Sequence, residues 1–418
     1  MKYLITGGSG FIGSNFIEYI LADDKTKRVY NIDKLTYAAD KTFAPKDERY
    51  TFTPYDIADI HDLNLVIRNH KFDVVVNFAS HSHVDNSISN PELFWSNNIS
   101  SYCRFLFTCQ KMQQDGDIGK FIHISTDEVF GDTDVDHPFN EASLFKPSSP
   151  YSASKASQEM FIHSLRKMYG FKANIVRLCN NYGPRQYKEK LLPVVINAIL
   201  KGKDIPVYGD GNQKREWIHV KESADIINQI ACNVNDNEDY CIGSGNVKTN
   251  IEVIKMLNSL FNGNNHDNIK FVVDRIGHDK LYLTDSSKVD FAYPKRNKIQ
   301  FEDGLKETFE FFKNKFDNIK LLVNINKNII HAMSENNSLH NGSTLMSAIE
   351  KATPVQVDTL WSILKYKEIG ILRKVKCMSD VVHLDTNNVL DELPADQEGR
   401  LLDYKTRHMI HDTLIKVS

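Results

Sequence analysis

The sequence predicts an α/β protein with a Rossmann-type, doubly wound parallel sheet, a smaller lobe and a C-terminal, mostly helical extension. Two observations predict this fold class. Short apolar runs alternate with helix-length amphipathic segments through the N-terminal half, and a glycine-rich turn follows the first apolar run. Such alternation is typical of parallel strands joined by crossover helices that cover both faces of a sheet.

The apolar runs are short and rich in Val and Ile, as expected of strands that are buried on both faces. We expect strands at residues 3–5, 29–32, 74–78, 121–124 and 174–178. The segments between them have helical length, and we expect helices that include residues 13–21, 59–69, 91–114 and 151–169. In a sheet of this kind, ligands bind at the carboxyl ends of the strands.

The chain is expected to have three parts. Residues 1–180 form the Rossmann domain, and residues 181–320 form a less regular substrate-binding lobe with some return to the sheet. Residues 321–418 carry no catalytic motif and form an accessory domain, which favours contact with a protein partner. Within it we expect helices at residues 344–351, 356–366 and 401–416, with a strand pair near 371–382.

The bulk composition is typical of a soluble globular protein. Apolar residues make up 41% and charged residues 25% of the 418 residues, and 51 Lys and Arg nearly balance 54 Asp and Glu. This balance argues against a nucleic acid or an anionic membrane as partner. The six cysteines form no CxxC pair, and the chain starts with a strand pattern rather than a targeting segment or membrane span. We therefore expect a cytoplasmic protein.

The glycine-rich turn carries a dinucleotide-binding pattern. Gly7, Gly10 and Gly13 directly follow the first expected strand and open a helix. They permit a tight turn, close approach to a pyrophosphate and close packing of the helix on the strand. Asp33 ends the second strand, where its carboxylate can accept hydrogen bonds from ribose hydroxyls and repel a 2′-phosphate. The pattern predicts NAD rather than NADP; a glycine turn without a ligand is the alternative.

Tyr151 and Lys155 are four residues apart on an expected helix, so they point from one face of it. A neighbouring ammonium and the positive ring of NAD would stabilise a phenolate. Lowering the pKa of a phenol by about three units requires about 4 kcal/mol of differential stabilisation. The phenolate can then take the proton of a sugar hydroxyl while hydride leaves the same carbon. Ser125 and Thr126, at a strand end, are expected beside this pair.

Several dense strings point to a known family. Residues 125–131 read STDEVFG, residues 150–156 read PYSASKA, and residues 180–184 read NNYGP. The strings EKLLP at 189–193 and DRIGHD at 274–279 continue the match. On these residues the chain resembles the extended short-chain dehydrogenases and, within them, the nucleotide-sugar 4,6-dehydratases. The resemblance spans residue 1 to about residue 315.

The adjacent acids Asp127 and Glu128 separate the dehydratases from other members of this family. Oxidation at C4 of the sugar makes the C5 proton acidic, and two carboxyl groups in opposite protonation states suit elimination of the C6 hydroxyl as water. The resemblance implies that Asp127 is the acid and Glu128 the base. It also implies hydride return to C6, with dTDP- or UDP-glucose converted to a 4-keto-6-deoxy derivative for rhamnose-type deoxysugar biosynthesis.

The motifs and the resemblance together assign three groups of site residues, and they imply a homodimer with no metal. The catalytic residues are Thr126, Asp127, Glu128, Tyr151 and Lys155. The cofactor-binding residues are Gly7, Gly10, Phe11, Ile12, Gly13, Asp33, Lys34, Thr36, Asp56, Ile57, Phe78, Ala79, Ser80, Asn97, Tyr151, Lys155 and Asn181. The substrate-binding residues are Ser82, Thr126, Asn180, Lys190, Leu191, Pro206, Tyr208, Arg215, Asn246, Arg275 and His278.

Two positions depart from the bacterial enzymes that the chain resembles. His81 stands where they usually carry Glu, and Asn86 stands where they usually carry Arg. The string HVDNS at 83–87 is closer to plant UDP-glucose enzymes, so the sequence leaves the nucleotide base open. A metal site at His81, His83 and Asp85 is a competing interpretation that lacks a further ligand pattern. The sequence also leaves open an epimerase or decarboxylase of the same family, and a non-catalytic scaffold that binds NAD.

Overall fold

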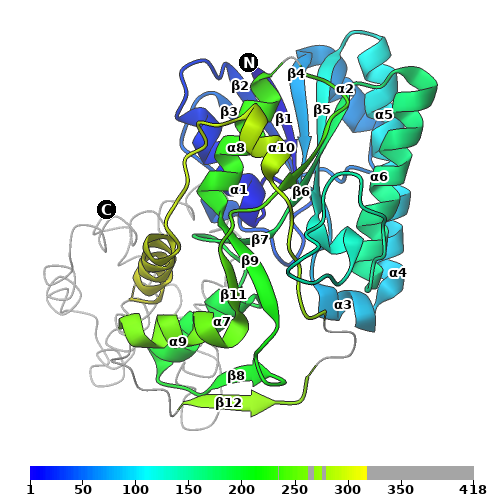
Figure 1. Ribbon diagram of the computed structural model, residues 1–418. Coiled ribbons are helices and arrows are strands. Elements are labelled where there is room, and N and C mark those ends of the chain that lie inside the picture. The colour runs from blue at the N-terminus through cyan, green and yellow to red at the C-terminus, as the bar shows by residue number, and fades with distance from the viewer. Residues whose placement is uncertain (234, 262–267, 275–278, 318–418) are drawn as a thin grey trace, which may run out of the picture. The chain divides into compact units, whose positions relative to one another are not determined.

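Seven parallel strands form the central sheet of the computed structural model, which describes residues 1–233, 235–261, 268–274 and 279–317 (Figure 1). Across the sheet the strands are β10 (Asp239–Ile242), β6 (Ala173–Leu178), β5 (Ile118–Thr126), β4 (Phe72–Asn77), β1 (Lys2–Thr6), β2 (Arg28–Ile32) and β3 (Tyr50–Thr53). The strand order reverses between β1 and β4, which is where such sheets bind ligands. The Rossmann-type sheet is confirmed, and each of the five predicted strands overlaps one of its members.

Helices cover both faces of the sheet, because successive strand residues point to opposite faces. Val75 and Phe121 belong to one face, which packs against α2 (Ile60–His70), α5 (Tyr102–Gln114) and α6 (Pro150–Tyr169). Val74 and Ile122 belong to the other face, which packs against α1 (Phe11–Leu21), α8 (Val220–Cys232) and α10 (Ser287–Ala292). The sheet is therefore buried between two helical layers.

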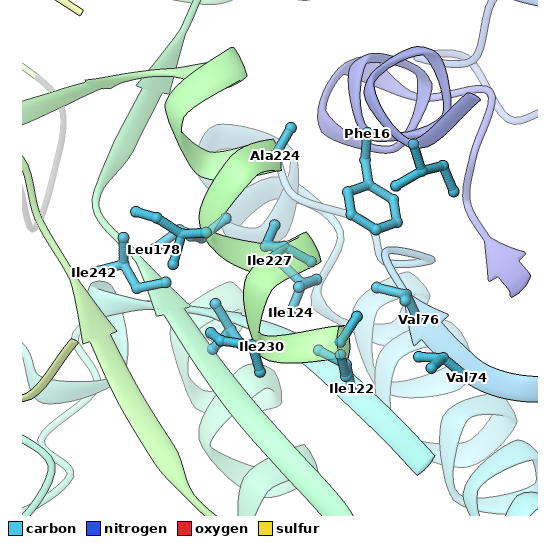
Figure 2. Packing of buried hydrophobic residues seen from close by; sticks show 14 of the residues in the cluster. Phe16, Val74, Val76, Ile122, Ile124, Leu178, Ala224, Ile227, Ile230 and Ile242 are labelled. Carbon is cyan, nitrogen blue, oxygen red and sulfur yellow. The ribbon is translucent and has the colours of Figure 1, made fainter. Parts of the chain in front are cut away.

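The layer of α1 and α8 packs against the middle of the sheet. Figure 2 shows Phe16 of α1 above Val76 and Ile227 of α8 above Ile124, with Leu178 to the left of Ile227. Each apolar side chain that is fully buried in this way contributes about 1.5–3 kcal/mol to folding. Because α8 follows β9 in the chain, segments more than 200 residues apart share this core.

The helix predicted at residues 91–114 is interrupted. It consists of α4 (Pro91–Phe94), a wide π-helical turn η2 (Trp95–Ser101) and α5. A π-turn inserts an extra residue and changes which side chains face inward. Here it turns both Asn97 and Asn98 inward, where Asn98 Nδ2 donates to the His81 carbonyl (2.9 Å) and to Ser154 Oγ (3.0 Å). The regular apolar spacing of the segment did not reveal this turn.

The smaller lobe combines two small sheets with three helices. The three-stranded sheet contains β7 (Asn180–Tyr182), β9 (Lys214–His219) and β11 (Val247–Thr249), and the two-stranded sheet contains β8 (Ile205–Tyr208) and β12 (Ile269–Val272). Its helices are α7 (Leu191–Lys201), α9 (Asn250–Phe261) and a helix over residues 301–317. Tyr182, Trp217 and Leu305 lie in its apolar core.

The chain also returns from this lobe to the main sheet, since β10 pairs with β6. Residues Met1–Phe312 form one compact unit, and the division of the chain at residues 180 and 320 stays a prediction. The elements expected between residues 344 and 416 lie outside the described residues. No helix in the described part of the chain has the length and apolar character needed to cross a membrane.

A fully buried ion pair links α6 to the edge of the sheet. Arg177 donates from Nε (2.9 Å) and Nη2 (2.6 Å) to Glu159 Oε2, and Nη2 also donates to Asp239 Oδ2 (3.0 Å). The Arg177 and Glu159 side chains are only 1% and 0% exposed. A charge at this depth needs its partner, because removing one partner leaves the other without compensation for its lost hydration.

We expect Arg177→Met to lower the free energy of unfolding by about 3–5 kcal/mol, since it leaves Glu159 buried without an ionic partner. The control is Arg68→Met, which removes the exposed Arg68–Asp115 pair and should cost less than about 1 kcal/mol. Urea unfolding followed by circular dichroism measures both losses. Equal losses for the two variants would contradict this account of the pair.

Candidate active site

A cavity opens at the carboxyl edge of the central sheet, around the reversal between β1 and β4. The predicted catalytic residues all line it, namely Thr126, Asp127, Glu128, Tyr151 and Lys155. The predicted cofactor-binding residues also line it, namely Gly7, Gly10, Phe11, Ile12, Gly13, Asp33, Lys34, Thr36, Asp56, Ile57, Phe78, Ala79, Ser80, Asn97, Tyr151, Lys155 and Asn181. The structure therefore brings both groups together in one place.

Two glycines at the junction of β1 and α1 have no room for a side chain, Gly7 in the turn and Gly13 at the start of α1. Gly7 has φ of +71°, and a Cβ there would lie 2.6 Å from the backbone nitrogen of Ala79. A Cβ on Gly13 would lie 2.5 Å from the Gly7 carbonyl oxygen. No side chain caps the start of α1, so the backbone N–H groups of its first turn face the cavity edge. This arrangement fits the pyrophosphate of a dinucleotide.

Asp33 lies at the end of β2, where the adenosine of a dinucleotide would bind. Its buried carboxylate accepts hydrogen bonds from the backbone N–H groups of Ser9 (3.0 Å) and Leu35 (2.8 Å). Burial raises the pKa of Asp33, although these two hydrogen bonds oppose the rise. Beside it, Lys34 Nζ donates to Asp56 Oδ2 (2.9 Å) and to Asn97 Oδ1 (2.6 Å). Three predicted cofactor residues from separate segments thus contact one another.

Tyr151 and Lys155 lie on the first turns of α6, which starts with a Ser149 capping box and Pro150. Lys155 Nζ donates to the Ile124 carbonyl oxygen (2.7 Å) of β5, and burial lowers its pKa to about 7. Burial also raises the pKa of Tyr151; the charges of Glu128 and Asp127 add to this rise, and a hydrogen bond with Thr126 opposes it. The low phenol pKa expected from the sequence therefore does not come from the protein groups alone, because burial dominates.

The acid pair follows β5 in the short 3-10 turn η3 (Asp127–Phe130). Thr126 caps this turn: its Oγ1 accepts from the Glu128 N–H (3.3 Å) and donates to Asp127 Oδ1 (3.2 Å). Asp127 is only 2% exposed. Burial raises the pKa of Asp127 well above its ordinary value, and the charges of Glu128 and Glu216 add to this rise. Asp127 is therefore suited to hold a proton at neutral pH, as an acid catalyst must.

Comparisons with known proteins agree with this geometry. A family model described as GDP-mannose 4,6 dehydratase matches residues 4–308. The dTDP-glucose 4,6-dehydratase 1 of Escherichia coli K12 is 34% identical over 362 residues, covering 81% of this chain and 99% of the relative. The dTDP-glucose 4,6-dehydratase of Haemophilus influenzae is 38% identical over 331 residues, covering 75% and 98%. The chain belongs to the nucleotide-sugar 4,6-dehydratase family.

A solved structure of the same family supports the fold and the cofactor. The dTDP-glucose 4,6-dehydratase of Streptomyces venezuelae, determined with NAD bound, has a TM-score of 0.70 and 36% sequence identity to this chain. The match covers 75% of this chain and 97% of that one. NAD is the cofactor of this 4,6-dehydratase; the glycine turn fits its pyrophosphate and Asp33 fits its adenosine ribose.

The dehydratase site also rests on two buried residues, His123 and Glu159, that no sequence motif identified. His123 of β5 is fully buried; its Nε2 lies 3.4 Å from Lys155 Nζ and its Nδ1 lies 3.0 Å from Tyr102 Oη. Ser125 Oγ donates to Glu159 Oε1 (2.5 Å), one helical turn beyond Lys155. One sequence signal could have revealed them: His123 and Arg177 each lie in an otherwise apolar strand, β5 and β6. A polar side chain in such a strand needs a buried hydrogen-bonding partner.

The predicted substrate-binding residues divide into three groups in the structure. Ser82, Thr126, Asn180 and Lys190 line the cavity. Others lie on the smaller lobe and are not among the lining residues, namely Leu191, Pro206, Tyr208, Arg215 and Asn246. Arg215 is buried there, with its guanidinium 4.5 Å from the centre of the Tyr282 ring. Arg275 and His278 lie outside the described residues.

Tyr37, which belongs to no motif in the sequence, contacts two residues that line the cavity, Glu189 and His81. Tyr37 Oη donates to Glu189 Oε1 (3.3 Å), and the Tyr37 ring lies parallel to the His81 ring with centroids 6.3 Å apart. Lys190 Nζ donates to the Ser82 carbonyl oxygen (3.2 Å). Three loops distant in sequence thus meet at the rim of the cavity. No group of three possible metal ligands occurs among the residues that the structure describes.

We expect Gly13→Ala to lose its bound NAD, because the new Cβ would push the Gly7 carbonyl into the pyrophosphate position. The control is Gly119→Ala, whose Cβ would lie equally close, at 2.5 Å, to the Asp73 carbonyl but near the start of β5. It should lower thermal stability and still retain NAD. Chromatography of the cofactor released from each purified protein measures the difference, and full NAD content in Gly13→Ala would refute the prediction.

Proposed function

We propose that this dehydratase converts dTDP- or UDP-glucose to the 4-keto-6-deoxy derivative, as a step in deoxysugar formation, with the residues of the Thr126–Lys155 cluster in the roles given below. The observation that carries the proposal is the buried Asp127 carboxyl, which directly precedes Glu128 and contacts Thr126. An enzyme that only oxidises and reduces C4 has no need of a protonated acid at this position. Elimination of water requires one.

Tyr151 removes the O4 proton in the first step. Bound NAD would supply the hydride acceptor for C4 and the hydride donor for C6, and its positive ring would favour the phenolate of Tyr151. Lys155, one turn after Tyr151 on α6, is held in place by its hydrogen bond to the Ile124 carbonyl. The Thr126 hydroxyl stabilises the phenolate through its hydrogen bond and is in reach of the sugar. Burial of these groups strengthens each electrostatic interaction among them.

Asp127 and Glu128 carry out the elimination. Glu128 removes the C5 proton, which the C4 ketone has made acidic, while Asp127 gives its proton to the C6 hydroxyl that leaves as water. Glu128 then returns its proton to C5 as hydride reaches C6. Burial raises the pKa of Asp127 and so favours its protonated form, whereas Glu128 is partly exposed to the cavity. The two neighbouring carboxyl groups thereby divide the acid and base roles.

The substrate has two ends, and we assign each to residues with suitable chemistry. Ser82, Thr126 and Asn180, at the cavity wall, would contact the sugar. The residues that would hold the nucleotide and its diphosphate are Lys190, Leu191, Pro206, Tyr208, Arg215, Asn246, Arg275 and His278. A guanidinium suits this role because it can donate two parallel hydrogen bonds to phosphate oxygens. Residues 321–418 are proposed to contact a protein partner.

An assay with both nucleotides tests the proposed reaction. Purified protein should convert dTDP-glucose or UDP-glucose to a product lighter by one water, without added reductant. A mass unchanged by the reaction would indicate an epimerase, and loss of carbon dioxide from a uronic acid would indicate a decarboxylase. Retention of NAD without any product would indicate a scaffold.

Variants of the acid pair separate the steps. Asp127→Asn and Glu128→Gln should lower turnover at least ~100-fold, the scale of one acid–base group, and accumulate enzyme-bound NADH, because C4 oxidation still proceeds. Tyr151→Phe should be equally slow without that accumulation. Stopped-flow absorbance of the reduced cofactor distinguishes them. If all three variants gave the same spectrum, the assigned roles would be wrong.

A homodimer is proposed from the exposed surface of α5 and α6, which lie side by side in Figure 1. Trp95, Phe107, Met160 and Met168 are 60%, 47%, 56% and 66% exposed on or beside these helices. Apolar side chains gathered on one face are typical of a contact surface. A two-fold axis would bury the same face of a second copy against them.

Charges on that face should separate the dimer. We expect the double variant Phe107→Glu and Met160→Glu to sediment as a monomer. Removing two carboxylates from water costs more free energy than the apolar contact contributes. The control is Phe291→Glu on α10, a residue that is 91% exposed on the opposite side of the sheet, and it should stay dimeric. Sedimentation of the wild-type protein as a monomer at every concentration would exclude the dimer.

A further inference from the structure

The proposed reaction requires one proton to move between two side chains in every turnover. Tyr151 takes the O4 proton and keeps it, since O4 remains in the product as a ketone. Asp127 gives its proton to the C6 hydroxyl, and that proton leaves in water. Glu128 returns to C5 the proton that it removed from C5. After each turnover Tyr151 therefore has one proton too many and Asp127 one too few, although substrate equals product plus water in atoms and charge.

Both side chains are shielded from solvent. Tyr151 is 9% exposed and Asp127 is 2% exposed, and a bound sugar would cover the cavity side that remains. Within the described part of the chain, Asp127 Oδ2 is buried without a hydrogen-bond partner, so its other oxygen, Oδ1, is the one with an established contact. Resetting the enzyme through bulk water would have to wait until the product leaves.

We propose that the Thr126 hydroxyl carries this proton from Tyr151 back to Asp127; the inference rests on the proposed function. Thr126 Oγ1 donates to Asp127 Oδ1 (3.2 Å), and the Thr126 side chain is hydrogen-bonded to Tyr151. The Tyr151 O–H bond breaks as a bond to Thr126 Oγ1 forms. The original Thr126 O–H bond breaks as an O–H bond to Asp127 forms. Thr126 ends as it began, and no other reactant is needed.

The backbone fixes the Thr126 hydroxyl in the orientation that such a transfer needs. A hydroxyl has one proton to donate and two lone pairs that accept. The Glu128 N–H donates to one lone pair of Thr126 Oγ1 (3.3 Å), because Thr126 caps the turn η3. The second lone pair can accept from Tyr151 while the hydroxyl proton points to Asp127. One side chain thus contacts both groups that must exchange a proton.

Neighbouring groups favour this direction of transfer over a route through Lys155. Lys155 Nζ contacts the Ile124 carbonyl (2.7 Å) and His123 Nε2 (3.4 Å), so a route through the lysine leads toward the buried histidine. Glu216 is buried with Oε2 accepting from Thr284 Oγ1 (2.8 Å). Its charge disfavours an ionised Asp127. At the other end of the transfer, burial raises the pKa of Tyr151, and the positive ring of bound NAD would oppose that rise by favouring the phenolate.

The experiment compares the first turnover with steady-state turnover. In Thr126→Val, which keeps the shape without the hydroxyl, Asp127 starts protonated, so one equivalent of product should form. Later turnovers of this variant should be at least ~10-fold slower than its first turnover, because Asp127 must regain its proton from solvent. Thr126→Ser keeps the hydroxyl and should retain the wild-type ratio of the two rates. Rapid chemical quench with the substrate that the wild-type enzyme turns over measures both rates.

The outcomes distinguish the proton relay (the transfer from Tyr151 to Asp127 through the Thr126 hydroxyl) from the dehydration reaction itself. If Thr126→Val slowed the first and later turnovers by the same factor, the hydroxyl would only stabilise the phenolate and the relay would be excluded. Should that variant fail to fold, the wild-type enzyme still decides. Its steady-state rate should not change with the concentration of imidazole buffer at constant pH, and a rate that rose with buffer would overturn the relay. A wild-type enzyme that makes no 4-keto-6-deoxy product would instead refute the proposed function.

Discussion

The contact between Lys155 and the Ile124 carbonyl determines the geometry of the whole site. It joins the first turns of α6 to the last residues of β5, two elements that the Ser125–Glu159 hydrogen bond also links. Because the ammonium is buried, it must keep this hydrogen bond, and the relative position of helix and strand follows from it. Tyr151 then faces Thr126, and the acid pair that continues β5 lies beside the phenol. Glu159, one turn further along α6, extends the same connection to Arg177 and the edge of the sheet.

Most of the fold and the central part of the site follow from local sequence signals. Parallel strands have short apolar runs, and the glycine turn with Asp33 has a fixed spacing relative to them, so both could be predicted from the chain. The Tyr151–Lys155 pair and the acids after β5 also have fixed spacing on one helix and one turn. The structure brings these groups to one cavity because all of them lie at the carboxyl edge of the same sheet.

Features that depend on distant contacts could not be predicted in this way. The π-turn at Trp95–Ser101 is stabilised by the polar contacts of Asn97 and Asn98 with other segments, and helical spacing carries no sign of them. The pKa of Tyr151 depends on burial by several elements, and the spacing of Tyr151 and Lys155 carries no sign of how far burial raises that pKa. Likewise, Tyr37 and Glu189 meet at the rim only because two loops fold toward each other.

The return of β10 to the edge of the central sheet has a consequence for how the chain acquires its structure. During synthesis from the N-terminus, β6 emerges about sixty residues before its partner, and α8, which completes one apolar face, also comes late. Until then an open parallel edge and an uncovered apolar face are available to other chains, which makes a nascent protein prone to aggregation. Pairing across such sequence separation is slow. The N-terminal half therefore keeps one sheet edge and one apolar face uncovered until α8 and β10 have been synthesised.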